Sequence, residues 1–161
     1  MTPRFIAAVG DVFVDRPEPG AALGGIAPLL EACDVTFANF EGVVTDRHAP
    51  VPGASDASIV PAAQAAPLRV FDVMSLANNH ALDAGHGGLA DTIEALESAV
   101  VGAGPTLADA SRPVVVEGVA FVAAAAVFPM GTEVQAGAPG IAPLRVEEYY
   151  AAPFPGMYLP G

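Results

Sequence analysis

Short apolar runs alternate with segments of helical periodicity along most of the chain, and this alternation predicts its secondary structure. Apolar runs of strand length, rich in β-branched and aromatic residues, lie at residues 4–9, 34–40 and 71–76. Segments with helical spacing of apolar residues lie at 20–32, 61–68 and 88–100. The last segment is the clearest, with one apolar stripe made of Leu89, Ile93, Leu96 and Val100. Strands that alternate with helices predict an α/β fold with a mostly parallel sheet.

The remaining segments contain turn-forming residues. Residues 113–117 and 119–128 flank Gly118 and predict a pair of strands joined by a tight turn. Residues 45–58 are polar and rich in proline and glycine, so we expect an exposed loop. Residues 147–161 are also rich in proline and glycine and show no period. The pattern therefore predicts one domain over residues 1–146 and a tail over residues 147–161.

Composition supports a folded domain and disfavours some partners. The chain has 161 residues, of which 53% are hydrophobic, and much of this fraction is alanine. This length is enough for one domain with a core of its own. Eighteen acidic residues against six basic ones give a net charge of −12, which disfavours nucleic acid and anionic membranes as partners. The single cysteine, Cys33, excludes an intrachain disulfide and is expected to be a small buried hydrophobe.

The sequence as written lacks the signs of a membrane segment or a secretion signal. Its first residues do not form a charged start followed by a long apolar stretch and a cleavage site. The longest apolar run without charge, residues 118–130, is too short to span a bilayer. We therefore expect a cytoplasmic protein.

Polar residues follow each of the three predicted strands at the point where the strand ends. Gly10 and Asp11 follow the first strand, Asn39 and Glu41 end the second, and the Asn78-Asn79-His80 run follows the third. The carboxyl ends of parallel strands line the ligand crevice of an α/β sheet. Carboxylate, amide and imidazole ligands in one place suit Mg²⁺, Mn²⁺, Fe or Zn²⁺. Two such ions would clamp a phosphate and activate water.

These motifs resemble those of one bacterial family. The stretch SLANNHALDAGHGGLADTIEAL is similar to the signature of the capsule-synthesis family of CapA and poly-γ-glutamate biosynthesis proteins. ANFEGVVT and AVGDVFVDR are similar to its two earlier motifs, and VVGAGPTLADASRPVVVEGVAFVAA and PGIAPLRV to later features. The resemblance covers residues 5–146 in the right order. It implies a calcineurin-like metallophosphoesterase α/β sandwich.

The resemblance also implies roles for individual residues. Asp11, Glu41 and Asn79 would be metal ligands, for one or two divalent ions. His80 would complete this set, or contact the scissile phosphate and serve as a general acid. Asn39, Asn78 and Asp83 are candidates for a supporting group in contact with the ligands or the substrate. For Asp83 the first interpretation is structural, as a brace of the loop after His80. Among the other candidates, His48 and His86 are expected in exposed loops, and Asp91 in a structural role.

The later ligand blocks of the family are missing from this sequence, which has no tryptophan and no histidine after His86. The resemblance therefore covers the N-terminal part of the family's domain, with an incomplete C-terminal part and a partly formed site. We expect a metallophosphoesterase-like protein of capsule or poly-γ-glutamate synthesis that acts on a phosphate ester or a polyanionic polymer. The alternative is a non-catalytic assembly or anchoring factor without a metal. A protein partner or a second copy would cover the sheet face that an incomplete domain exposes.

Overall fold

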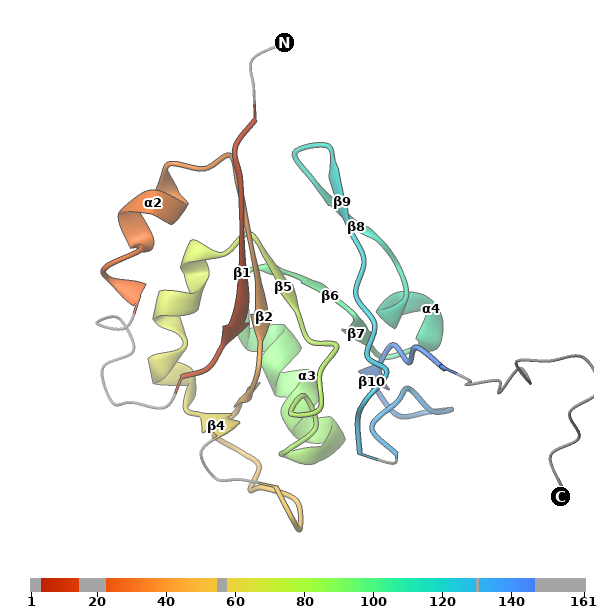
Figure 1. The fold of residues 1–161 in the computed structure, drawn as a ribbon. Coiled ribbons are helices and arrows are strands. Elements are labelled where there is room, and N and C mark those ends of the chain that lie inside the picture. Colours follow the sequence, from red (N-terminus) through yellow and green to blue (C-terminus); the bar gives the residue numbers. More distant parts are fainter. Residues whose placement is uncertain (1–3, 15–22, 55–57, 130, 147–161) are drawn as a thin grey trace, which may run out of the picture.

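A parallel sheet of four strands organises the computed structural model, which describes residues 4–14, 23–54, 58–129 and 131–146 (Figure 1). The strands lie in the order β1, β2, β5, β6, and every neighbouring pair is parallel. Their bounds are Ile6–Val12, Val35–Phe40, Val73–Ser75 and Ala99–Val101. The predicted α/β class with a parallel sheet is confirmed. The predicted tail, residues 147–161, lies outside the described residues.

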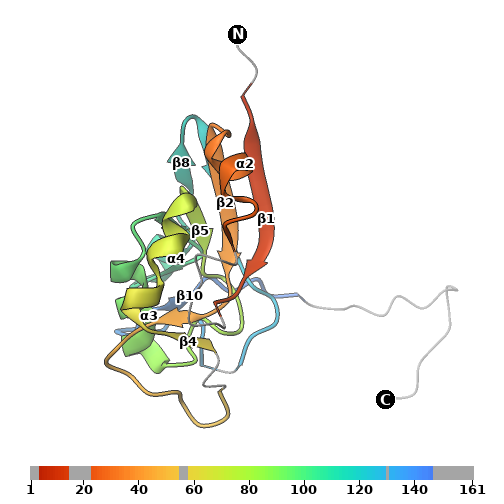
Figure 2. The ribbon, with the colours of Figure 1, turned by 90° about the vertical axis from the view of Figure 1, so that its left-hand side faces the viewer.

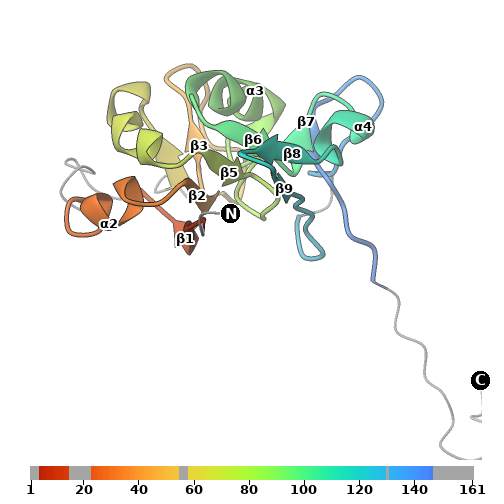
Figure 3. The same ribbon diagram turned by 90° about the horizontal axis from the view of Figure 1, so that it is seen from above.

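Helical segments cover one face of this sheet (Figure 3). They are α2 (Ala27–Glu31), the 3₁₀ turns η2 (Ala62–Gln64) and η3 (Ala66–Val70), and α3 (Gly85–Ala95). The core lies between these segments and the sheet, where Phe40 and Met74 of the strands meet Leu68 and Leu89 of the helical segments. All four side chains are at most 1% exposed. Burial of large apolar side chains, each contributing about 1.5–3 kcal/mol, holds the two layers together.

The opposite face of the sheet is only partly covered. The hairpin of β8 (Val114–Val116) and β9 (Val119–Phe121) lies on this side near β6, and Phe121 stacks on Phe37 of β2 with ring centroids 5.5 Å apart (Figure 3). The hairpin does not cover the β1 edge of the sheet. There Ile6 of β1 is 49% exposed and the preceding Phe5 is 63% exposed. The sheet face is therefore apolar and open at its β1 side.

The first strand is longer than the sequence predicts. It does not end at Gly10 but continues through Asp11 to Val12, as the long strand in Figure 2 shows. The register with β2 shifts between Ala8, which pairs with Phe37, and Asp11, which pairs with Asn39. One extra residue of β1 is accommodated there, which is the signature of a bulge. Both paired positions lie on the open face of the sheet.

Five further expectations need correction. The helix predicted over 88–100 begins at Gly85 and ends at Ala95. Val100, the last residue of the predicted apolar stripe, belongs instead to β6, a strand that sequence analysis missed. The predicted loop 45–58 is exposed only in its middle, because Thr45 and Ser58 are 5% and 1% exposed. These two residues adjoin a short parallel ribbon of β3 (Val43–Val44) and β4 (Ile59–Val60).

The helix predicted over 20–32 is shorter than expected, since α2 begins at Ala27; residues 20–22 lie outside the described residues. The segment 61–68 forms the two 3₁₀ turns rather than a helix. Cys33, expected to be buried, is partly exposed, and its thiol donates to the Leu29 carbonyl over 3.4 Å.

After the sheet the chain forms a small lobe. Its elements are β7 (Ala103–Gly104), α4 (Leu107–Ala110), the β8–β9 hairpin and β10 (Gly140–Ile141), which pairs antiparallel with β7 (Figure 1). The hairpin turn has positive φ at both Glu117 (50°) and Gly118 (78°), which matches the tight-turn geometry expected from the sequence. The hairpin prediction is confirmed, although β9 ends at Phe121.

Gly102 joins the sheet to this lobe, and we predict that the stability of the protein is highly sensitive to substitution at this residue. Its φ is +84°, and a β-carbon there would lie 2.6 Å from the β-carbon of Ala77 and 2.8 Å from that of Ala123. Replacement Gly102→Ala should cost about 2–4 kcal/mol, because backbone strain and overpacking add. Gly137→Ala is the matched control, since Gly137 has φ +80° but a β-carbon there would meet nothing within 4 Å. Urea unfolding followed by circular dichroism measures both; equal costs for the two variants would contradict the packing argument.

Candidate metal and catalytic site

The sheet brings three of the predicted polar residues to one edge. Asp11 and Asn39 are paired in register on β1 and β2, and Asn39 is paired with Ser75 on β5. Glu41 follows β2 directly, and its backbone N–H donates to the Val12 carbonyl over 3.0 Å. The strand ends therefore place a carboxylate on each of two neighbouring strands, as the sequence predicts.

The two carboxyl groups interact directly. The pKa of Glu41 is raised above its ordinary value, first by burial and then by the negative charge of Asp11. The charge of His80 acts in the opposite direction, and a hydrogen bond from the Glu41 carboxyl to Asp11 adds to the increase in pKa. Two like charges side by side favour a proton or a cation between them. Glu41 therefore lies in the electrostatic field of both Asp11 and His80.

A chain of amide groups fixes the surroundings of this pair. The Asn39 amide donates to Asp11 Oδ1 over 2.7 Å, and the Asn78 amide donates to Asn39 Oδ1 over 3.1 Å. Asn78 also donates to the Phe40 carbonyl over 2.8 Å and accepts the His80 N–H over 3.0 Å. The amide oxygens of Asn39 and Asn78 are therefore acceptors within the protein. Asn39 thus contacts Asp11 and Asn78 contacts the His80 backbone, and the supporting role expected for both residues stays a prediction.

His80 is held by a carboxylate of its own loop. Its Nδ1 lies 2.8 Å from Asp83 Oδ2, and the Asp83 N–H donates to the His80 carbonyl over 3.0 Å. Since a carboxylate can only accept, Nδ1 carries the proton when the imidazole is neutral. The Nε2 atom is then left with its lone pair.

Asn79 stands apart from this network. It is exposed, and it lines a cavity of about 180 Å³ together with Asp83, residues 51–54, Pro129 and Thr132. The wall of this cavity is largely apolar, with Val51, Leu82 and Pro129 among its residues. The role predicted for Asn79 as a ligand stays a prediction.

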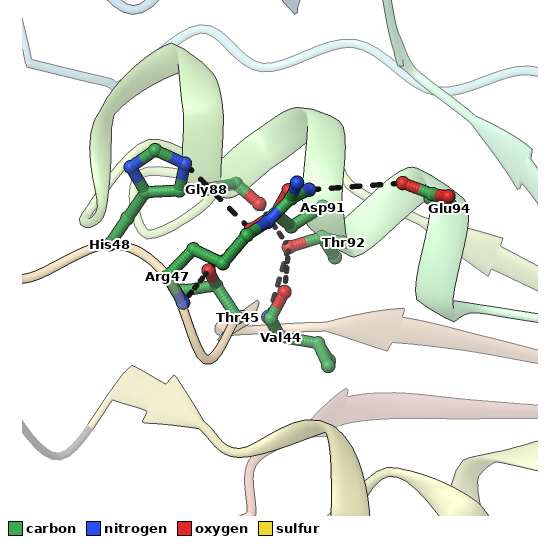
Figure 4. A network of polar contacts seen from close by, with 8 residues as sticks. All are labelled: Val44, Thr45, Arg47, His48, Gly88, Asp91, Thr92 and Glu94. Atoms are coloured by element: carbon green, nitrogen blue, oxygen red, sulfur yellow. Dashed lines mark hydrogen bonds and ion pairs between the residues drawn. The ribbon is translucent and has the colours of Figure 1, made fainter.

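A second polar network, which sequence analysis missed, anchors the loop after β3 to α3 (Figure 4). Its centre is Asp91, which is 8% exposed. Thr45 donates to Asp91 Oδ2 over 2.5 Å, Arg47 donates to the same oxygen through Nε over 3.1 Å, and the Arg47 guanidinium also pairs with Oδ1. His48 Nε2 lies 3.8 Å from Asp91. Asp91 thus has the structural role expected, although nothing in the sequence identifies Arg47 as its partner.

The anchored loop reaches the candidate site. The Val51 N–H donates to the Asp83 carbonyl over 2.7 Å, so the loop and the segment that carries His80 are bonded to each other.

The ring of His48 lies against Gly87, where a β-carbon would be 2.6 Å from the imidazole. His48 and His86 are both exposed, as expected, and His86 Nδ1 donates to the Pro139 carbonyl over 2.6 Å. Gly85, Gly87 and Gly88 form the start of α3.

The donor set suits a divalent cation but is small. Asp11 and Glu41 supply carboxylate oxygens, which Mg²⁺ and Mn²⁺ favour, and His80 is near enough to affect Glu41 electrostatically. Within residues 4–14, 23–54, 58–129 and 131–146, no three histidine, cysteine or acidic side chains form a group that could hold a metal ion. The pair fits two ligands of a cation, and the remaining positions stay open to water, substrate or other groups.

Comparison with known proteins identifies the family of this chain. The bacterial capsule synthesis protein family, PGA_cap, matches residues 5–152. The chain belongs to this family. Two uncharacterized proteins of Sinorhizobium fredii (strain NBRC 101917 / NGR234), y4sH and y4uA, are each 36% identical over 112 residues. The matched part covers 62% of this chain and 24% of each relative, so the chain spans about a quarter of their length.

This family membership confirms the resemblance on which the site residues were assigned. In the part of the chain that the structure describes, no helix combines the length and the apolar character needed to cross a membrane.

The carboxylate pair leads to a prediction about stability without metal. Because the folded state raises the pKa of Glu41, the folded state binds a proton more tightly than the unfolded chain, and stability falls as pH rises above the unfolded value. Glu41→Gln should therefore raise the Tm of the metal-free protein at pH 7. Addition of Mn²⁺ should raise the Tm of the wild type more than that of the variant. Calorimetry with and without Mn²⁺ checks both signs, and a lower Tm for metal-free Glu41→Gln would contradict the repulsion.

The Asp91 network predicts a separate effect of pH. The pKa of Asp91 is lowered, first by the hydrogen bond from Arg47 and then by that from Thr45. Its contribution to stability is therefore present above the unfolded pKa, near 3.9, and is lost as pH falls through the lower folded value. The difference in urea midpoint between wild type and Asp91→Asn should be large at pH 6 and shrink below pH of about 4. The control is Glu94→Gln, since the 83% exposed Glu94 side chain is 3.9 Å from Arg47; a similar pattern in this variant would contradict the assignment.

Proposed function

We propose that this chain carries part of a divalent-metal-dependent phosphoesterase site that serves capsule or poly-γ-glutamate synthesis. Asp11 and Glu41 hold the cation, Asn79 adds a ligand from the third strand end, and His80 acts beside them. The domain then has the calcineurin-like α/β sandwich, of which the parallel sheet and its helical layer form one half. The substrate is a phosphate ester or a polyanionic polymer.

The observation that carries the proposal is the carboxylate pair at the strand ends. Burial and, after it, the negative charge of Asp11 raise the pKa of Glu41, while the charge of His80 lowers it. Such an arrangement reduces stability unless a positive charge compensates for it. Perturbed acids that converge with an imidazole at strand ends are typical of functional sites.

The charges of the protein explain why a cation is needed for an anionic substrate. The chain has no lysine, and its positive side chains are six arginines. The five arginines within the described ranges each lie within 4 Å of an acidic side chain. A phosphate that approaches the site therefore meets Asp11 and Glu41 without a free arginine from those ranges to neutralise it. A divalent ion on the carboxylate pair reverses this repulsion.

The residues of the chain then have distinct tasks. A divalent ion held by Asp11 and Glu41 would polarise the phosphoryl oxygen and lower the pKa of water. Asp83 accepts a hydrogen bond from Nδ1 of His80 and so orients the ring. In its protonated form His80 can donate the Nε2 proton to the leaving oxygen, and Asp83 stabilises the positive charge of the ring before transfer. Asn39 and Asn78 keep Asp11 and the His80 backbone in place.

A second function is favoured by a different observation. The apolar side of the sheet at β1 is open, with Phe5 63% and Ile6 49% exposed, and no group of three candidate metal ligands forms in the described ranges. Exposed apolar surface of this kind marks contact with other proteins. The alternative is therefore a non-catalytic assembly or anchoring factor with the family fold.

Metal titration and turnover separate the two functions. Isothermal titration with Mn²⁺, Mg²⁺, Fe²⁺ and Zn²⁺ should show binding in the micromolar range, reduced more than ~10-fold by Asp11→Asn because a ligand is lost. His80→Ala should lower metal-dependent hydrolysis of p-nitrophenyl phosphate by ~10²–10⁴-fold, because a general acid is lost. Glu31→Gln, which makes the same kind of acid-to-amide change on exposed α2, is the control and should alter neither.

The opposite results are equally informative. No binding of any of the four ions at micromolar concentration would reject the phosphoesterase and favour the assembly factor. Turnover that requires His80 would reject the assembly factor.

A further inference from the structure

Ser58 lies directly behind the His80–Asp83 pair. Its side chain is buried, with 1% of the residue exposed, and its hydroxyl donates to Asp83 Oδ2 over 2.5 Å. The same oxygen lies 2.8 Å from His80 Nδ1. One carboxylate oxygen therefore accepts from both Ser58 and His80.

Ser58 also touches the segment that carries the carboxylate pair. Its carbonyl oxygen lies 2.9 Å from where a β-carbon of Gly42 would be, so only glycine fits after Glu41. The strands that follow these two residues pair in parallel, with Val43 opposite Ile59. Ser58 is thus fixed against the residue next to Glu41 through its backbone and against Asp83 through its side chain.

We infer that Ser58 is a positioning residue that sets the tautomer and orientation of His80 relative to Glu41. The inference deepens the proposed function, because it concerns the imidazole to which that function gives a catalytic task. Ser58 acts through Asp83 and does not itself contact the substrate.

The physical reason lies in the burial of Asp83. This residue is 7% exposed, and a buried carboxylate needs hydrogen-bond donors to replace water. The Ser58 hydroxyl is one donor and holds Oδ2 where Nδ1–H of His80 can reach it. Without that hydroxyl the carboxylate is free to turn toward other donors, and the imidazole loses the acceptor that selects the Nδ1–H tautomer. The Nε2 atom of His80 would then no longer be held with its lone pair toward the candidate site.

The tautomer can be measured without turnover or metal. Long-range ¹H–¹⁵N spectra of metal-free, ¹⁵N-labelled protein, recorded at a pH where imidazole is neutral, distinguish protonated from unprotonated ring nitrogens. In the wild type, His80 should show protonated Nδ1 and unprotonated Nε2. In Ser58→Ala the two nitrogen shifts should move toward each other, as expected for mixed tautomers. Ser58→Cys, which keeps a weak donor of similar size, should give an intermediate spectrum.

Two comparisons exclude a general structural effect. Ser98→Ala removes a hydroxyl that donates to the Phe71 carbonyl over 2.6 Å, away from His80, and should leave the His80 spectrum unchanged. The chain has only two other histidines, His48 and His86, whose signals should not move in Ser58→Ala and serve as internal references. A His80→Gln spectrum assigns the His80 signals.

The outcomes for Ser58 and for the proposed function are separate. An unchanged His80 tautomer in Ser58→Ala, or an equal change in Ser98→Ala, overturns the role of Ser58 whether or not the protein is an enzyme. Absence of metal-dependent hydrolysis overturns the proposed function and leaves the tautomer result standing. If hydrolysis is present, Ser58→Ala should lower kcat by ~10–100-fold, as loss of an orienting contact does.

Discussion

The candidate site depends on the placement of two carboxylates, Asp11 and Glu41, at one edge of the sheet. Asp11 is the next-to-last residue of β1 and Glu41 follows β2, and the fold does not separate them. Parallel pairing makes this unavoidable, since strand ends of the same direction meet at the same edge. The surrounding amides of Asn39 and Asn78 do not neutralise the charge; they only hold its position. Under the proposed function, a cation held by this pair would offset the cost of placing the two carboxylates together.

The sheet separates two kinds of surface. On its helical face, side chains such as Phe40 and Met74 are fully covered, and this face supplies the stability of the domain. The other face is covered by the β8–β9 hairpin near β6 and is open at β1. The polar site lies at the end of the strands and is supported by loops that come from the helical side, through Arg47, Asp91 and Ser58. Stability and chemistry thus come from different parts of the same strands.

The sequence was sufficient for the features that depend on strand periodicity and strand ends. It predicts β1, β2 and β5 and the convergence of Asp11, Glu41 and the segment with His80, because apolar runs and the polar residues after them are local signals. It misses β6, because Ala99–Val101 continues the apolar stripe of the preceding helix. It also misses β3 and β4, since two-residue strands have no period. Arg47 and Ser58 lie in or beside a predicted loop, and their partners are 44 and 25 residues away along the chain, so no local pattern identifies them.

The bulge in β1 has a consequence for how the length of this strand can change. The extra residue lies between Ala8 and Asp11, and a β-carbon at Gly10 would meet nothing within 4 Å. Loss of Gly10 would make the pairing regular, with Asp11 still opposite Asn39 and still on the open face. Loss of a residue inside β2 has no such remedy, because every later side chain of that strand would change face. The first strand is therefore a place in the sheet where the chain can shorten by a residue and keep its carboxylate pair.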